Sequence, residues 1–205
     1  MTPETYLAYL AVVAVFFATP PDTSQLLVMS NAMRHGLRRS LATVAGDLTA
    51  NALQMTAAAF GLASLVAVSA DALGVVKWLG VAYLAWLGLR LLLRREAPGA
   101  PAPSGARLFR QGFVTSSANP YAVVFLGALF PQFIDPAAPI LPQLLILGAT
   151  YIAVDGLTLA LWGWAASRAA ARVPVGRWLE RVSGGLMIAA AALLASRDLS
   201  ELNAR

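Results

Sequence analysis

The sequence of 205 residues contains no cysteine and only one histidine, His35. Without cysteine the chain has no disulfide, no thiolate metal site and no dithiol redox pair. His35 stands among loop arginines, where a solvated or lipid-headgroup position is expected, so we leave it out of the site. The sequence also lacks an HExxH motif, a serine or cysteine nucleophile with a histidine base, and a phosphate-binding loop. We therefore expect no enzyme, no cofactor and no resident metal.

Charge is scarce as well, since charged residues make up 12% of the chain while hydrophobic residues make up 59% and the mean hydropathy is +0.68. This composition lies far from that of a soluble domain and predicts an all-α integral membrane protein whose surface meets the lipid bilayer. The first residues, Met1 to Glu4, contain no basic n-region. We expect the first apolar stretch to be retained as a spanning helix.

Six stretches approach the roughly 20 mostly apolar residues that a spanning helix needs. They are Tyr6–Met29, Leu41–Val68, Leu73–Leu93, Gln111–Phe133, Leu141–Ala166 and Trp178–Ser196. Arginines gather in the first, third and fifth connections, which predicts that these face the cytoplasm and that both termini lie outside. The net charge of +5 is thus explained by topology. Arginines divided among short loops without a stacking platform give no reason to expect nucleic acid.

A Pro/Gly/Ala-rich stretch at residues 96–108 is expected to be a cytoplasmic linker. It separates three predicted helices in residues 1–95 from three in residues 109–205. An odd number of helices in each half makes the second half enter from the opposite side, as in two inverted three-helix repeats.

Each half carries a proline break in its first helix and an aspartate in its second. The breaks, which we expect in the first and fourth helices, are Thr19-Pro20-Pro21 with Asp22, and Asn119-Pro120; the aspartates are Asp47 and Asp155. Proline removes a backbone donor and clashes with the preceding turn, and broken backbone at membrane depth is tolerated only inside protein or beside a watery cavity. A charged, broken membrane helix is typical of a transport path.

The second predicted helix carries a polar stripe at helical spacing, formed by Thr43, Asp47, Asn51 and Gln54. From a rise of about 1.5 Å per residue, Asp47 lies roughly 9 Å inside the cytoplasmic end, and Asp22 and Asn119 lie at comparable depths. Asp155 lies deeper, at roughly 20 Å, where it is expected to form a second station of the pathway.

Structural readings of these residues remain open at this stage. A membrane aspartate also serves as a hydrogen-bonding group or as a partner for a cytoplasmic arginine such as Arg38. Asn119-Pro120 also fits a simple kink whose asparagine satisfies a freed carbonyl group. Small residues at four-residue spacing, such as Gly46 and Ala50, fit close helix contacts and permit a homodimer.

Four segments together resemble the lysine exporter family, in particular its homoserine/threonine resistance branch. They are Thr19-Pro20-Pro21-Asp22 with the following Leu26 to Gly36, Ala45-Gly46-Asp47, Leu79 to Gly88 before an arginine-rich end, and Ala118-Asn119-Pro120 leading to Leu129-Phe130-Pro131-Gln132-Phe133. The resemblance implies a six-helix exporter of amino acids in the bacterial inner membrane, driven by the proton gradient. The family commonly has Pro-Gly-Pro where this chain has Thr19-Pro20-Pro21, and a lysine where it has Tyr121.

The mechanism we expect is antiport, in which Asp22 and Asp47 bind either protons or a cationic amino group. Asn51, Asn119 and Asp155 complete the predicted site, and the broken backbone at Pro20-Pro21 and Pro120 offers free polar groups to an amino acid or related metabolite. Removal from water favours the neutral form of a carboxyl group, so a proton can reset the site. Two alternatives stay open: a divalent-metal exporter using the carboxylates, and a noncatalytic membrane scaffold.

Overall fold

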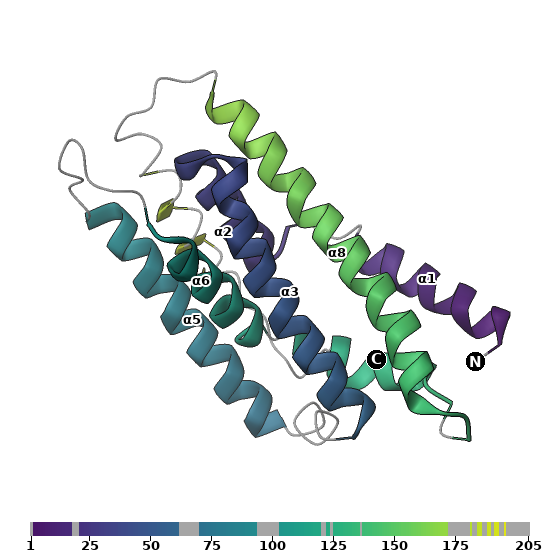
Figure 1. Cartoon of the computed structure of the whole chain (residues 1–205). Helices are drawn as coiled ribbons and strands as arrows, with labels where there is room; N and C mark the ends of the chain where they lie inside the picture. The colour runs from purple at the N-terminus through teal and green to yellow at the C-terminus, as the bar shows by residue number, and fades with distance from the viewer. Residues whose placement is uncertain are drawn as a thin grey trace.

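The computed structural model describes residues 2–17, 21–61, 70–93, 103–119, 122–123, 125–135 and 137–171, and single positions 181, 184, 185, 188, 189, 191, 192 and 195. Within these residues the chain is helical and contains no strand. Helices α3, α5 and α6 lie side by side, and α8 runs along the other side of α3 (Figure 1). Helix α2 packs against both α3 and α8. The all-α prediction is confirmed.

The first predicted span, Tyr6–Met29, is two helices: α1 is Pro3–Phe17 and α2 is Thr23–His35. The residues on either side of the proline pair therefore belong to separate helices. Helix α2 also continues beyond the predicted end at Met29 and ends at His35. It ends there because Gly36 takes a positive φ of 79°, and the Gly36 N–H donates to the Ala32 carbonyl oxygen.

The second and third predicted spans correspond to α3, Leu37–Ala59, and α5, Ala70–Leu93. Helix α3 begins four residues before the predicted start and ends before the predicted end at Val68. It ends early because Phe60 caps the helix and Gly61 follows with a φ of 81°. Residues 62–69 lie outside the described part of the chain.

The fourth predicted span, Gln111–Phe133, is divided in the structure. Helix α6 is Gly105–Ser117, and it is followed by a π-helix, η1, at Phe125–Leu129 and a 3-10 helix, η2, at Phe130–Phe133. The predicted linker 96–108 runs too far, because Ser104 accepts a hydrogen bond from the Arg107 N–H and caps a helix that begins at Gly105.

The fifth predicted span, Leu141–Ala166, is α8, Ile140–Ala170. Its 31 residues give a length of about 45 Å, enough to cross a bilayer. Among the described residues, α8 alone is long and apolar enough to span a membrane, and Pro3–Val15 is apolar but shorter. The six-span inverted repeat is therefore not confirmed. Most of the sixth predicted span, Trp178–Ser196, lies outside the described residues.

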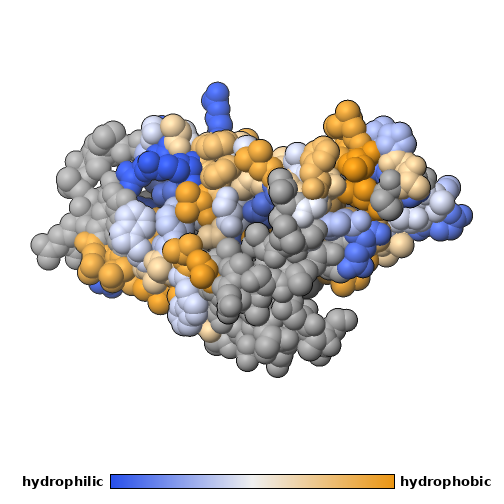
Figure 2. Space-filling model, turned by 90° about the horizontal axis from the view of Figure 1, so that it is seen from below, coloured by the Kyte–Doolittle hydropathy of each residue, from blue (hydrophilic) through white to orange (hydrophobic). Residues whose placement is uncertain are grey.

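Helix α8 separates an outer apolar face from a mixed inner face. Its outer face exposes leucines, and Figure 2 shows apolar side chains reaching the surface of the described part of the molecule. The exposed leucines are Leu141, Leu145, Leu157 and Leu161, and a row of buried residues at four-residue spacing is Gln143, Leu147, Tyr151, Asp155 and Leu159. An apolar outer face with a polar residue turned inward is typical of a membrane helix that lines a path.

Helices α3 and α6 cross backbone against backbone at two glycines. A Cβ atom at Gly46 would meet the carbonyl oxygen of Phe109, and a Cβ atom at Gly112 would meet that of Thr43. The expected close contact at Gly46 is thus present, with Gly112 as its counterpart. This crossing brings the polar stripe of α3 against the residues at the end of α6.

An aromatic cluster joins α1, η1, η2 and α8. We use this name for Tyr9, Phe17, Phe125, Phe130, Phe133 and Tyr151. The Tyr9 ring stands edge-on to Phe130 and Phe133 at centroid distances of 6.3 and 5.1 Å, and the Tyr9 hydroxyl donates to the Leu147 carbonyl oxygen at 2.9 Å. This cluster packs the side of α8 next to Asp155, one helical turn from Tyr151.

Candidate functional site

Asp22 begins helix α2 as its N-cap. Its Oδ1 accepts a hydrogen bond from the Gln25 N–H at 2.9 Å, and its own N–H donates to Gln25 Oε1 at 3.3 Å. This reciprocal capping box satisfies backbone donors at the start of a helix, which is why the chain resumes its helix directly after the proline pair. The carboxylate thus has a structural task at the break.

The other oxygen of Asp22 connects the two predicted helix breaks. Asn119, two residues after the end of α6, donates from Nδ2 to Asp22 Oδ2 at 2.8 Å. The two residues are 97 positions apart in the chain. The structure therefore brings the first break of each half into direct contact, and Asn119 does more than satisfy a kink.

Asn51 bridges the two aspartates of α3 and α8. Its Nδ2 donates to Asp47 Oδ2 at 3.0 Å and to Asp155 Oδ2 at 2.8 Å. The two carboxylate oxygens are consequently no farther apart than these two hydrogen bonds combined. Asp155 was expected to be a second station, but it shares Asn51 with Asp47, so the two aspartates belong to one site. The depth estimate placed Asp47 too near the helix end, because α3 begins at Leu37, four residues before the predicted start.

Ser116 completes the bridge from α6. Its hydroxyl donates to Asn51 Oδ1 at 2.8 Å, and its backbone carbonyl accepts from Gln54 Nε2 at 3.3 Å. The sequence prediction did not include Ser116. In the predicted helix Gln111–Phe133, Ser116 stands three residues before Asn119 on the same side, and this was the signal available for finding it.

We call this group the polar cluster. Its members come from the N-cap of α2, from α3, from the end of α6 and the segment that follows it, and from α8, and they are Asp22, Asp47, Asn51, Ser116, Asn119 and Asp155. All but the half-buried Asp22 are at most 5% exposed. The Asp22 carboxyl group lies near enough to interact electrostatically with the other two aspartates. Three acids concentrated in a buried region disfavour full ionisation and attract positive charge.

Several buried polar atoms have no hydrogen-bond partner among the described residues. Asp47 Oδ1 is one of them, although Asp47 is only 2% exposed. The others in residues at most 7% exposed are the hydroxyls of Thr23, Ser30 and Thr115. Leaving a buried polar atom unpaired costs about 1–3 kcal/mol, so such atoms are typical of a place where water or a ligand binds.

A second polar contact lies farther along α2. Asn31 donates from Nδ2 to Thr43 Oγ1 at 2.9 Å and to Gln111 Oε1 at 3.1 Å. It joins α2, α3 and α6 one or two turns from the polar cluster, on the side of the loop arginines. Thr43, expected on the polar stripe, therefore pairs with Asn31 and takes no direct part in the aspartate bridge.

The amide group of Asn51, which lies between the Asp47 and Asp155 carboxylates, indicates which kind of ligand this site can bind. An amide NH₂ occupies the space between Asp47 and Asp155, where a bound metal ion would need oxygen ligands directed at it. Within the described ranges, no group of three or more His, Cys, Asp or Glu side chains is arranged to hold a metal ion. The arrangement suits organic donors and protons.

The structure thus brings together Asp22, Asp47, Asn51, Asn119 and Asp155, all five of the predicted binding residues. Of the predicted helix-break residues, Pro21 is described and half-buried. Thr19, Pro20 and Pro120 lie outside the described residues, as does Tyr121.

Comparison with known proteins matches residues 6–198 to a family model described as LysE type translocator. The chain is 34% identical over 206 residues to the homoserine/homoserine lactone efflux protein of Salmonella typhi, covering 96% of this chain and 98% of that one. It is 37% identical over 158 residues to an uncharacterized membrane protein of Vibrio cholerae, covering 75% and 77%. It is 32% identical over 135 residues to the leucine efflux protein of Klebsiella pneumoniae, covering 63% of each chain. No solved structure matches the chain.

Proposed function

Since the chain belongs to the LysE type translocator family and is a membrane transport protein, we propose that it exports amino acids or close derivatives from the bacterial cytoplasm in exchange for protons. Relatives named as efflux proteins for homoserine, its lactone and leucine support the substrate class. The polar cluster is the proposed site of binding and exchange.

The observation that carries this proposal is that Asn51 joins Asp47 to Asp155 while the second carboxylate oxygen of Asp47 has no hydrogen-bond partner among the described residues. Asn51 uses both amide hydrogens to hold Asp47 and Asp155, while Asp47 Oδ1 has no partner within the described residues. An ammonium group supplies the missing donor and a positive charge. The bridge therefore leaves one oriented acceptor for the amino group of a substrate.

Proton exchange follows from the same arrangement. Two carboxyl groups this close resist carrying two negative charges in a buried site. A proton on the pair and a bound ammonium group are then alternatives, and release of one favours uptake of the other. Asp22 takes a positioning role in this scheme, because both of its carboxylate oxygens already accept hydrogen bonds.

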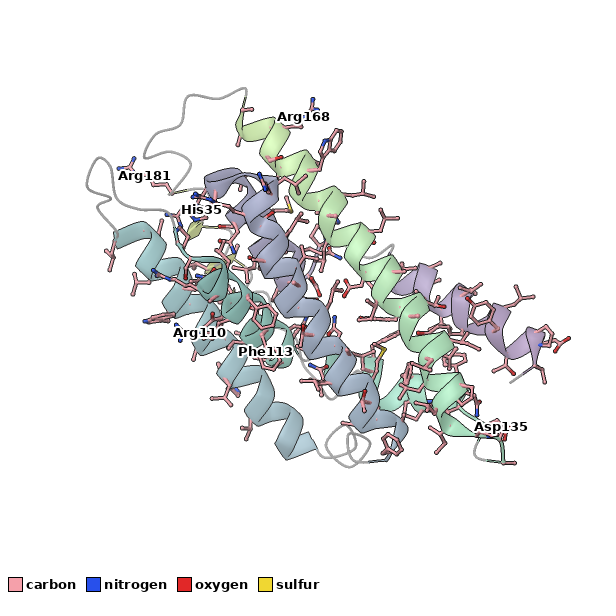
Figure 3. All side chains as sticks on the ribbon, viewed as in Figure 1. His35, Arg110, Phe113, Asp135, Arg168 and Arg181 are labelled. Carbon is pink, nitrogen blue, oxygen red and sulfur yellow. The ribbon has the colours of Figure 1, made fainter. Side chains whose placement is uncertain are left out.

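We also propose the six-span topology with both termini outside and the three-helix halves as inverted repeats. In support, His35, Arg168 and Arg181 lie toward one end of the molecule and Asp135 lies at the other (Figure 3). His35 belongs to the arginine-rich first connection, Arg168 to the fifth and Arg181 to the start of the sixth predicted span, and the positive-inside rule assigns this side to the cytoplasm. A homodimer through small-residue faces belongs to the same proposal.

Reconstituted export tests the function. Proteoliposomes are loaded with a mixed amino-acid pool, and the species that leave under an imposed proton gradient are measured for the wild type, Asp47→Asn and Asp135→Asn. Asp135 is exposed and lies outside the polar cluster, so its variant is the matched control. We expect selective export by the wild type and the control, and its loss in Asp47→Asn. Gradient-driven export that survives in Asp47→Asn would remove the polar cluster from the mechanism.

A further inference from the structure

Asn31 joins three helices between the polar cluster and the arginine-rich end of the molecule. Its Nδ2 donates to Thr43 Oγ1 of α3 at 2.9 Å and to Gln111 Oε1 of α6 at 3.1 Å. By helical rise the three residues lie about 6 to 14 Å beyond the polar cluster on their own helices. They lie toward the end where His35 and Arg168 are found (Figure 3). Asn31 is 5% exposed and Thr43 is fully buried, so one buried amide group ties α2 to α3 and α6 at this level.

An apolar layer lies next to this contact, where α2 meets α3 and α8. Val28 of α2, Val44 of α3 and Leu159 of α8 pack together, and each is at most 6% exposed. Val44 directly follows Thr43, so the layer and the polar contact lie at a similar level. Close-packed apolar side chains leave few voids large enough for water. We call this layer and the Asn31 contact together the seal, because they separate the polar cluster from the arginine-rich end.

The helices of the seal are joined by contacts of different kinds. Helices α3 and α6 cross backbone against backbone at Gly46 and Gly112. Helix α2 packs closely on α8, where a Cβ atom at Gly163 would meet the Val28 side chain at 3.2 Å. Between α2 and the α3–α6 pair, by contrast, Asn31 makes two neutral hydrogen bonds, which water can replace at a small net cost. We therefore expect the seal to open most readily between α2 and the α3–α6 pair.

We propose that Asn31 is a latch that holds the polar cluster closed to the cytoplasm and opens to admit the substrate between α2 and the α3–α6 pair. This inference rests on the proposed function, in which the substrate arrives from the cytoplasm. Water and a polar substrate that enter there offer Asn31, Thr43 and Gln111 new hydrogen-bond partners, so opening leaves no buried polar group unpaired. A hydrogen-bonded latch therefore opens and closes at a smaller cost than a wholly apolar seal.

The absence of cysteine from the chain permits a direct test. Ser116→Cys places a single thiol in the polar cluster of the full-length protein with little change of volume. Inside-out membrane vesicles expose the cytoplasmic face, and a charged, membrane-impermeant maleimide measures how fast the thiol is modified from that face. Right-side-out vesicles give the rate from the other face. The reporter is compared alone and combined with Asn31→Ala, Thr43→Val, Thr43→Ser or Thr49→Ala.

We expect Asn31→Ala to speed modification from the cytoplasmic face at least about tenfold, because losing both hydrogen bonds favours the open state. Thr43→Val removes one acceptor and should speed it about threefold, while Thr43→Ser keeps the hydroxyl and should keep the slow rate. Thr49→Ala is the matched control on α3. The Thr49 hydroxyl is exposed and donates to the Ala45 carbonyl oxygen of the same helix, so its loss should leave the rate unchanged.

Unchanged rates in both Asn31→Ala and Thr43→Val, or an equal acceleration from both faces, would overturn the latch. Acceleration from the outer face alone would also overturn it, because the contact would then close the opposite side. These results leave amino-acid export by the wild type untouched, since the labelling needs no substrate. Export is measured separately in proteoliposomes, and a wild-type protein that exports no amino acid would contradict the proposed function instead.

Discussion

Two buried clusters meet on helix α8, and the chain completes only one of them. In the aromatic cluster, Tyr9 packs edge-on against Phe130 and Phe133 and its hydroxyl donates to the Leu147 carbonyl oxygen. In the polar cluster, one helical turn away, Asp47 keeps an oxygen without a partner among the described residues. The hydrogen bond of Tyr9 is made within the protein, whereas the free acceptor of Asp47 is where we propose that a ligand binds.

This difference separates stability from function along a single helix. Apolar packing close to Tyr151 favours the folded state and needs no ligand. The concentration of acids around Asp155 lowers the stability of the folded state, because removing charged groups from water costs free energy that their hydrogen-bond partners offset only in part. Such arrangements are typical of functional sites. We therefore expect substitutions in the aromatic cluster to lower stability, and substitutions in the polar cluster to lower export with little change in stability.

The largest effect is expected for Phe130→Ala in the aromatic cluster. Phe130 is fully buried, and removing its ring leaves a cavity that should cost about 4 kcal/mol of stability. Denaturation of the purified protein in detergent measures it. Phe130→Leu, which keeps most of the volume, should cost less than about 1.5 kcal/mol. Equal stability of the alanine variant and the wild type would show that this cluster does not hold the fold.

Asp155→Asn should reverse this pattern. Losing one acid of the bridged pair should lower export about a hundredfold, because a buried charged hydrogen-bond partner is worth several kcal/mol. The stability of the purified protein should stay within about 1 kcal/mol of the wild type, since the new amide retains the shape of the side chain. Flux in proteoliposomes and denaturation are measured on the same preparation. An unfolded variant would instead assign Asp155 a structural role.

Ser116→Ala should have an intermediate effect on export. It removes the hydroxyl that donates to Asn51 Oδ1 and so loosens the bridge, which should lower export about tenfold. Ser116→Thr keeps the hydroxyl and should restore most of the flux. If the threonine variant is as slow as the alanine variant, the volume at this position matters and the hydrogen bond does not.

Tyr9→Phe should have the smallest effect. The ring contacts remain and only the hydrogen bond to the Leu147 carbonyl oxygen is lost, so stability should fall by about 1 kcal/mol. Export should be unchanged, because Tyr9 belongs to the aromatic cluster. A tenfold loss of export with normal stability would contradict the separation of the two clusters.

Runs of apolar residues predicted the apolar helices, and the proline pair predicted the interruption between α1 and α2. The limits of α8 came within one residue at its start and four at its end. The separation of α1 from α2 followed from Pro20-Pro21. Helix α6 was placed too late, because its first turns are polar and amphipathic and give no apolar run. The N-cap residue Ser104 would have indicated the start of α6, but it lies within the Pro/Gly/Ala-rich stretch that we interpreted as a linker.

The members of the site were predictable, but their partners were not. Asp22, Asp47 and Asp155 were conspicuous as acids in apolar stretches. That Asn51 joins two of them, and that Asn119 meets Asp22, depends on contacts between residues about a hundred positions apart. Those contacts are decided by how the helices cross, and a single sequence contains no direct record of that.

The glycine crossing of α3 and α6 also constrains how the transporter can move. Gly46 and Gly112 bring these helices so close that each backbone occupies the space a side chain of the other would need. Separating them would break this close backbone contact, so we expect the two helices to move together. Helix α3 belongs to the first half of the sequence and α6 to the second. The units that we expect to move therefore do not follow the proposed three-helix halves, and we expect any hinge to lie beside this pair of helices.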